Sequence, residues 1–227
     1  MRVGIGMGRP LDRTSRYCQV VAGIDEAGRG PLAGPVVVAA VVLPRALRID
    51  GIADSKILDA PVREALYERI VREAAVATVV VGPRRIDAMN IRMATLWGMA
   101  RAVEALPVTP TVALVDGRDV PPGIAVKARA LVGGDGRSSA VAAASIVAKV
   151  TRDRLMTRLA AVFPGYGFER NKGYPTPEHR AALAVLGPCE HHRQSFAPVR
   201  EALAARRLPG AAAVEALPPA AVVAPAP

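Results

Sequence analysis

Two adjacent acids, Asp25 and Glu26, stand where an apolar run meets a glycine-rich turn. A third acid, Asp116, ends the apolar run 112–115 and precedes Gly117. Ligands of open α/β sheets gather at the carboxyl ends of strands, so these three acids are candidates for one site. Asp25 and Glu26 can share that site only if the chain leaves the strand there, because adjacent strand residues point to opposite faces. The alternative is structural: a turn-capping Asp25 beside a solvated Glu26, and an Asx turn at Asp116.

A fourth acid, Asp135, lies in the glycine-rich loop 133–136. Taken alone it is an ordinary turn residue, and it matters only if the fold brings it near the other three. Four carboxylates without His or Cys companions suit hard cations such as Mg²⁺ or Mn²⁺. Two such ions would activate water and stabilise the leaving oxygen of an in-line displacement, which makes phosphate chemistry the natural reaction class.

The formal net charge of +10 favours a polyanionic partner, either nucleic acid or an anionic membrane, although a solvated basic surface is the simpler alternative. No apolar stretch is long enough for a membrane span, and the first residues carry no signal-peptide core, so we expect no membrane association.

Cys18 and Cys189 are far apart and form no C-x-x-C pair. That spacing argues against a zinc knuckle or a disulfide framework and indicates a reducing cytoplasm.

Hydrophobic patterning predicts strands that alternate with helices along the chain. The interleaving indicates an α/β domain, with a mixed sheet because its first two strands form a hairpin. We expect a flexible lead-in over 1–18, a catalytic domain over 19–204 and a disordered Ala/Pro-rich tail over 205–227. The expected strands are 20–25, 35–43, 76–81, 111–116 and 124–131, and the expected helices are 61–75, 84–106, 138–162 and 176–186.

The motifs of residues 19–200 closely resemble those of the bacterial ribonuclease HII family. The longest match is the segment 23–36, GIDEAGRGPLAGPV. The second long match is 144–153, ASIVAKVTRD. Shorter matches follow in the family's order: DSKIL at 54–58, NIRMATL at 90–96, VDG at 115–117, YGF at 166–168, KGYPT at 172–176 and HRQSFAPV at 192–199.

This resemblance implies a ribonuclease-H-like fold: a five-stranded mixed sheet flanked by helices, with a small C-terminal helical part. It implies a monomeric endonuclease that cuts the RNA strand of RNA–DNA hybrids and nicks duplex DNA 5′ to an embedded ribonucleotide. The products would be a 3′-hydroxyl and a 5′-phosphate. The implied cofactors are Mn²⁺ or Mg²⁺ ions, two of them during catalysis. By position, the metal-binding and catalytic acids are Asp25, Glu26, Asp116 and Asp135.

The resemblance also implies how ribose is recognised. The turn Gly28-Arg29-Gly30 matches the family's ribose-recognising turn. Tyr174 matches a tyrosine that packs against the deoxyribose after the ribonucleotide; the alternative is a half-buried core tyrosine. Lys56 is expected to contact a backbone phosphate, which sets affinity without reading sequence.

Other polar residues near these motifs are expected to be structural. Asp153 is expected to pair with Lys149 or a nearby arginine rather than act as a further acid. His179 is expected to pack, and His191 and His192 to be structural or phosphate-adjacent.

Two other functions remain as alternatives. One is a module of the same fold that binds hybrids without cutting them. The absence of one of the four acids would indicate such a module. The other is a DNA-only nuclease such as a junction resolvase, against which the turn and Tyr174 argue, because such an enzyme needs no 2′-hydroxyl sensor.

Overall fold

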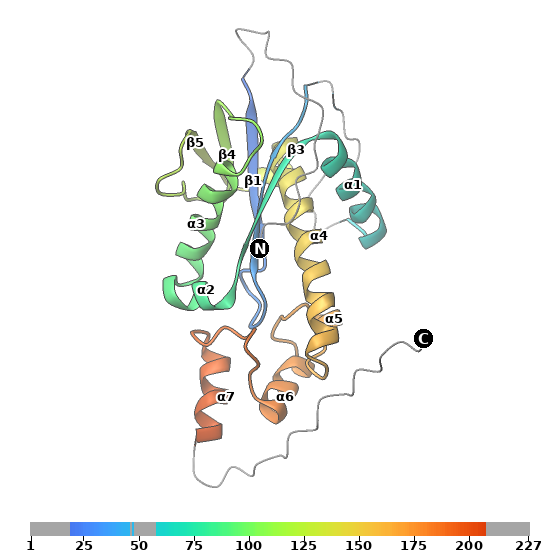
Figure 1. Ribbon diagram of the computed structural model, residues 1–227, viewed down its shortest axis with the longest axis vertical. Helices are drawn as coiled ribbons and strands as arrows, with labels where there is room; N and C mark the ends of the chain where they lie inside the picture. Colours follow the sequence, from blue (N-terminus) through green and yellow to red (C-terminus); the bar gives the residue numbers. More distant parts are fainter. Residues whose placement is uncertain (1–18, 46, 48–57, 208–227) are drawn as a thin grey trace, which may run out of the picture.

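The computed structural model describes residues 19–45, 47 and 58–207, which fold around one five-stranded sheet (Figure 1). The strand order is β3-β2-β1-β4-β5, in which β1–β2 and β2–β3 pair antiparallel and β1–β4 and β4–β5 pair parallel. The predicted mixed sheet is therefore confirmed. The strands are β1 Val21–Ala27, β2 Val36–Val42, β3 Ala75–Val81, β4 Val112–Asp116 and β5 Lys127–Leu131.

Helices cover both faces of the sheet, with α1 and α4 on one side and α2 and α3 on the other (Figure 1). The remaining helices follow α4 and build the small C-terminal part that the resemblance implied. No helix within the described residues is both long and apolar enough to cross a membrane. The helices are α1 Ala60–Glu73, α2 Pro83–Met89, α3 Ile91–Glu104, the 3-10 turn η1 Gly134–Gly136, α4 Ser139–Val162, α5 Phe168–Asn171, α6 Pro177–Leu186 and α7 Ala197–Arg207.

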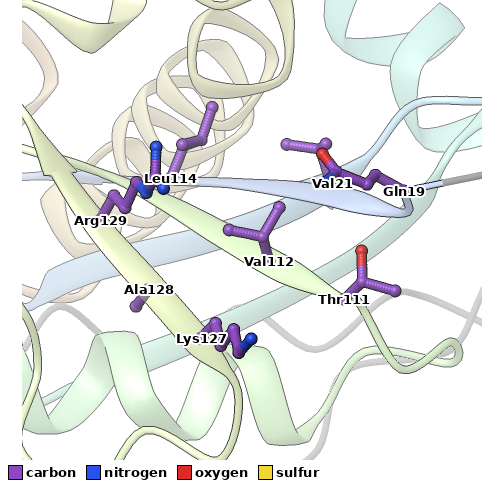
Figure 2. Close-up of a pocket in the computed structure, with 8 residues that line it drawn as sticks. All are labelled: Gln19, Val21, Thr111, Val112, Leu114, Lys127, Ala128 and Arg129. Atoms are coloured by element: carbon purple, nitrogen blue, oxygen red, sulfur yellow. The ribbon is translucent and has the colours of Figure 1, made fainter.

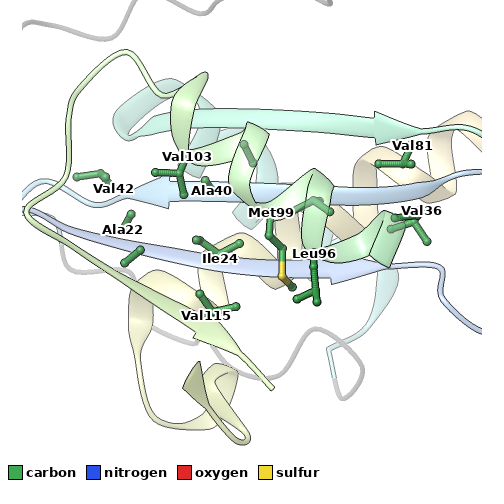
Figure 3. Close-up of a cluster of buried hydrophobic side chains, with 14 of the residues drawn as sticks. Ala22, Ile24, Val36, Ala40, Val42, Val81, Leu96, Met99, Val103 and Val115 are labelled. Atoms are coloured by element: carbon green, nitrogen blue, oxygen red, sulfur yellow. The ribbon is translucent and has the colours of Figure 1, made fainter. Parts of the chain in front are cut away.

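The interior strand β2, between β3 and β1, is buried on both faces, which explains why its sequence is a continuous apolar run rather than an alternating one. Its even-numbered residues, such as Val38 and Ala40, join the cluster under α3 (Figure 3). Its odd-numbered residues Ala39 and Val41 join the cluster under α1 and α4. Burial on both sides fixes the register of the sheet, because a slip by one residue would exchange the two faces.

Helix α4 approaches β1 so closely that only glycine fits between them. A Cβ atom on Gly23 would lie 2.0 Å from the backbone carbon of Ala140, in the first turn of α4. Further along, a Cβ atom on Gly28 would lie 1.9 Å from Nε of Arg152. The helix therefore packs directly on the backbone of β1 at Gly23, and its Arg152 side chain packs on Gly28 just beyond the strand.

The single helix expected over 84–106 is wrong, because the chain breaks at Asn90 into α2 and α3. Asn90 has a φ of 65° and its side chain accepts a hydrogen bond from the backbone nitrogen of Met93 at 3.0 Å. Asparagine tolerates positive φ and caps helix N-termini, so one residue ends α2 and starts α3. The apolar spacing did not reveal the break, because both helices face the same core cluster.

Three further boundaries differ from the expectation. Strand β1 runs two residues past Asp25, and β5 begins at Lys127 rather than at 124. Helix α7 continues to Arg207, beyond the predicted end of the domain at 204. The rest of the predicted tail and the predicted lead-in lie outside the described residues.

A buried histidine pair lies in the C-terminal part: His179 packs in the interior as expected, and His192 takes the structural one of its two expected roles. The backbone nitrogen of Cys189 donates to Nδ1 of His192 at 3.0 Å. Nε2 of His192 lies 3.0 Å from Nε2 of His179, whose Nδ1 lies 2.9 Å from the carbonyl oxygen of Tyr174. The only tautomers that satisfy this chain are neutral, with one proton on Nε2 of His192 and one on Nδ1 of His179.

Acid is expected to destabilise the protein through this pair. Burial and the neighbouring His179 lower the pKa of His192 to about 4, and burial lowers the pKa of His179. A histidine with a depressed folded-state pKa gives stability that is complete above its unfolded pKa of about 6.5 and is lost as pH falls toward 4. From pH 7.5 to 5.0 the loss through His192 is about 2 kcal/mol. Urea unfolding at both pH values should show a smaller loss for His192→Gln; equal losses would contradict the assignment.

Candidate active site

Asp25 faces α4 from the carboxyl-terminal end of β1. It is 6% exposed, and its carboxylate accepts hydrogen bonds from the backbone nitrogen of Glu26 at 2.7 Å and from the side chain of Ser145. The strand does not end here as expected: Asp25 and Glu26 both pair with β2, opposite Ala39 and Val38. The two acids therefore extend to alternate sides of a continuous strand.

Asp116 lies beside Asp25 because β1 and β4 are parallel neighbours. Ile24 pairs with Val115, and Asp25 and Asp116 are the next residue along each strand. Burial, then the negative charges of Glu26 and Asp116, raise the pKa of Asp25 well above its ordinary value. Asp25 is thus close enough to both Glu26 and Asp116 to be repelled by their charges.

Asp135 is carried to the same end of the sheet by η1. The backbone nitrogen of Gly134 donates to Oδ1 of Asp116 at 2.8 Å, which fastens this turn to the end of β4. A Cβ atom on Gly134 would lie 3.3 Å from that same oxygen, so there is little room for a side chain at this position. The carboxylate of Asp135 itself accepts from the backbone nitrogen of Gly136 at 2.9 Å.

Among the described residues, no three His, Cys, Asp or Glu side chains form a group that could hold a metal ion. The acids share one end of the sheet without closing into such a group, and Oε1 of Glu26 lies 3.3 Å from the Arg29 guanidinium. The donor chemistry nevertheless fits a hard divalent cation, since every donor is a carboxylate oxygen. A cation among these acids would also offset the repulsion that raises the pKa of Asp25.

The turn 28–30 and Tyr174 lie next to each other and next to the acids. A Cβ atom on Gly30 would be 3.5 Å from Cε1 of the Tyr174 ring. Arg29 and Gly30 are exposed, and Gly28 has a φ of 97°, which favours glycine. Tyr174 is 44% exposed, so part of its ring is accessible from solvent. The turn and the tyrosine together form a surface that a nucleic acid strand can reach.

Asp153 forms an ion pair with Lys149 at 2.8 Å, as expected for a structural acid. Lys56 lies outside the described residues. Sequence reasoning missed Arg152 and Arg193, which are almost completely buried behind the turn. Both residues belong to quoted motifs, but charged residues are rarely buried, and nothing in the sequence marked these two as interior.

A cleft of about 730 Å³ opens over β1, β4 and β5 on the same sheet face as α4, away from the turn and Tyr174 (Figure 2). None of the predicted site residues lines it. Its lining residues are Gln19, Val21, Thr111, Val112, Leu114, Lys127, Ala128 and Arg129.

Comparison with known proteins agrees with the motifs. A family model described as ribonuclease HII matches residues 22–199. A ribonuclease HII from Azorhizobium caulinodans is 59% identical over 79% of this chain and 69% of its own length. The crystal structure of ribonuclease H2 from Pyrococcus horikoshii OT3 superposes with a TM-score of 0.71 at 28% identity, over 83% of this chain and 99% of that one. The structure of Bst-RNase HIII in complex with Mn²⁺ shares the fold. It superposes with a TM-score of 0.63 at 19% identity, over 83% of this chain and 70% of that one.

Proposed function

Because the chain belongs to the ribonuclease HII family, whose members are endoribonucleases acting on RNA–DNA hybrids, we propose that it also nicks duplex DNA 5′ to an embedded ribonucleotide. The products are a 3′-hydroxyl and a 5′-phosphate, and the working unit is a monomer. One observation carries the proposal. Asp25 lies near both Glu26 and Asp116 at the adjoining ends of β1 and β4, and the exposed turn 28–30 follows on the same strand with Tyr174 against it.

The acids are the proposed holders of divalent metal ions. Asp25 and Asp116 offer carboxylate oxygens from adjacent strand ends, and Glu26 and Asp135 offer theirs from the flanking positions. Ser145 fixes the orientation of the Asp25 carboxylate through its hydrogen bond from α4. When bound, Mg²⁺ or Mn²⁺ would activate a water molecule and offset the charge that develops on the phosphate.

Selectivity for RNA requires a sensor of the 2′-hydroxyl, which both donates and accepts hydrogen bonds. Gly28 and Gly30 carry no Cβ, so the backbone of the turn can come close to a sugar. The exposed ring of Tyr174 offers an apolar face to the deoxyribose of the following nucleotide. The net charge of +10 supplies attraction to the phosphates of any duplex, without selectivity.

The experiment that tests this function offers three labelled duplexes: an RNA–DNA hybrid, a DNA duplex with one ribonucleotide, and an all-DNA duplex. With Mn²⁺ present, the first two should be cut and the third should remain intact, with a nick 5′ to the single ribonucleotide. A chelator should stop both reactions. Equal cutting of the two DNA duplexes would indicate a DNA-only nuclease, and tight binding without cutting would indicate a binding module.

Tyr174→Ala is expected to reduce kcat/KM at a lone ribonucleotide about tenfold, which corresponds to the loss of one ring–sugar contact of about 1.4 kcal/mol. Affinity for the all-DNA duplex, which rests on phosphate contacts, should change less than twofold. Tyr174→Phe keeps the ring and is the matched control, with near-normal activity. Steady-state cleavage and competition by unlabelled DNA measure the two quantities; equal losses in both would remove Tyr174 from recognition.

A further inference from the structure

Two arginines lie almost completely buried behind the turn 28–30, with Arg152 at 1% exposure and Arg193 at 0%. In the part of the chain that the structure describes, neither forms an ion pair. Burying a charge without an opposite charge is unfavourable unless hydrogen bonds replace its lost water. These two guanidinium groups therefore need a specific set of acceptors.

Those acceptors are backbone carbonyls, and five of them lie in the segment 28–35. Arg193 donates from Nε to Gly34 at 3.0 Å, from Nη1 to Arg29 at 2.9 Å and from Nη2 to Gly28 at 2.5 Å. Arg152 donates to Pro35 at 3.0 Å and Ala33 at 3.3 Å. The segment that follows the acids on β1 is thus held along its buried side by two guanidinium groups.

The hydrogen bonds from Arg193 determine where the N–H groups of the turn point. In a trans peptide the carbonyl and the next N–H point in opposite directions, and the described chain has no cis bonds. Since the carbonyls of Gly28 and Arg29 point inward to Arg193, the N–H groups of Arg29 and Gly30 point outward. Neither N–H donates a hydrogen bond among the residues that the structure describes.

Arg152 connects the same segment to the tyrosine. Its Nη2 also donates to the carbonyl of Lys172 at 2.9 Å, and its guanidinium carbon lies 5.9 Å from the centre of the Tyr174 ring. The backbone nitrogen of Leu32 donates to Gly173 at 2.8 Å, which ties the two segments again. The turn and Tyr174 are therefore fixed relative to each other by buried contacts.

We propose that Arg193 is a positioning residue that aims the N–H groups of Arg29 and Gly30 at the ribose of the substrate, with Arg152 holding the turn against Tyr174. This inference rests on the proposed function, in which the turn senses the 2′-hydroxyl. Burial, and then the nearby charge of Arg152, lower the pKa of Arg193 to about 9, so the arrangement carries an electrostatic penalty. Features that are costly for folding are expected where a protein fixes a functional geometry.

Arg193→Lys tests the role, because lysine keeps the positive charge but has no planar fork to donate to three carbonyls at once. The measurement is the ratio of two dissociation constants, for an all-DNA duplex and for the same duplex with one ribonucleotide, with Mg²⁺ present. Both are determined in an Asp25→Asn background so that nothing is cut. If part of the protein is unfolded, both apparent dissociation constants rise by the same factor, so their ratio does not change.

Arg193→Lys should lower this ratio about tenfold while the dissociation constant for all-DNA duplex stays within twofold. Val103→Ala, at a 4% exposed core position on α3, is the control for lost stability and should keep the full ratio. An unchanged ratio in Arg193→Lys overturns the positioning role. A ratio near one in the parent protein overturns the ribose sensor itself, and so separates failure of the proposed function from failure of this inference.

Should Arg193→Lys fail to fold, two further measurements carry the test. Arg152→Lys loosens the other end of the segment and should also lower the ratio. Amide resonances of Arg29 and Gly30 should shift strongly on adding the ribonucleotide duplex and weakly on adding all-DNA duplex. An unchanged ratio in Arg152→Lys, or equal shifts with the two duplexes, would overturn the proposal.

Discussion

Asp25→Asn is expected to reduce hybrid cleavage about a thousandfold while hybrid binding stays within about twofold. The substitution keeps the shape of the side chain but replaces a charged metal ligand with a neutral amide. Loss of the metal's charge stabilisation, about 4 kcal/mol, corresponds to three factors of ten in rate. Binding should persist because it rests on phosphate contacts elsewhere on the basic surface.

The same variant should be more stable than the parent protein. Burial and two neighbouring carboxylates raise the pKa of Asp25, which means that its charged form is unfavourable in the folded state. A neutral amide removes that penalty, so the melting temperature should rise while activity falls. Asp119→Asn is the matched control at an exposed acid paired with Arg92, and it should cleave normally. Joint loss of cleavage and binding in Asp25→Asn would contradict the division between catalysis and affinity.

Gly23→Ala is expected to destabilise the fold by about 3 kcal/mol or more, at the upper end of overpacking penalties. The new Cβ atom would meet the carbon and oxygen of Ala140 at 2.0 and 2.2 Å, and backbone atoms cannot rotate away as a side chain can. Helix α4 would have to move off β1, carrying Ser145 away from Asp25. Cleavage should therefore fall together with stability.

Urea unfolding measures this loss, and Gly82→Ala is its control. A Cβ atom on Gly82 would have no neighbour within 4 Å, and its φ of −72° is ordinary, so this variant should stay within about half a kcal/mol of the parent. Equal stability of the two variants would show that α4 does not need a glycine at position 23.

The strands of the sheet and the acids near their ends could be predicted from sequence, because a strand buried on both faces has a distinctive, continuous apolar pattern. The apolar run over 35–43 became β2, and the acids at 25 and 116 lie at adjacent strand ends as their sequence contexts indicated. The break at Asn90 could not be predicted, since one residue with positive φ leaves the apolar spacing of both helices intact. Continuation of β1 through Glu26 was also missed, because pairing with β2 outweighs the nearby glycines.

The buried residues that support the turn could not be predicted from sequence, for a different reason. Arg152 and Arg193 carry charge, which by itself indicates a surface position. Their burial is explained by the carbonyls of the segment 28–35 and of Lys172, which are backbone groups and carry no sequence signal. The network Cys189–His192–His179 likewise depends on contacts between segments that the fold alone brings together.

The central claim is that acids from β1, β4 and η1 share divalent metal ions beside a ribose sensor. Anomalous diffraction from crystals grown with Mn²⁺ and a hybrid carrying a non-cleavable linkage measures this directly. The predicted result is Mn²⁺ within direct coordination distance, about 2.0–2.6 Å, of carboxylate oxygens of Asp25 and Asp116, with Glu26 and Asp135 completing the site. Manganese bound elsewhere, or Asp116 and Asp135 out of its reach, would contradict the account.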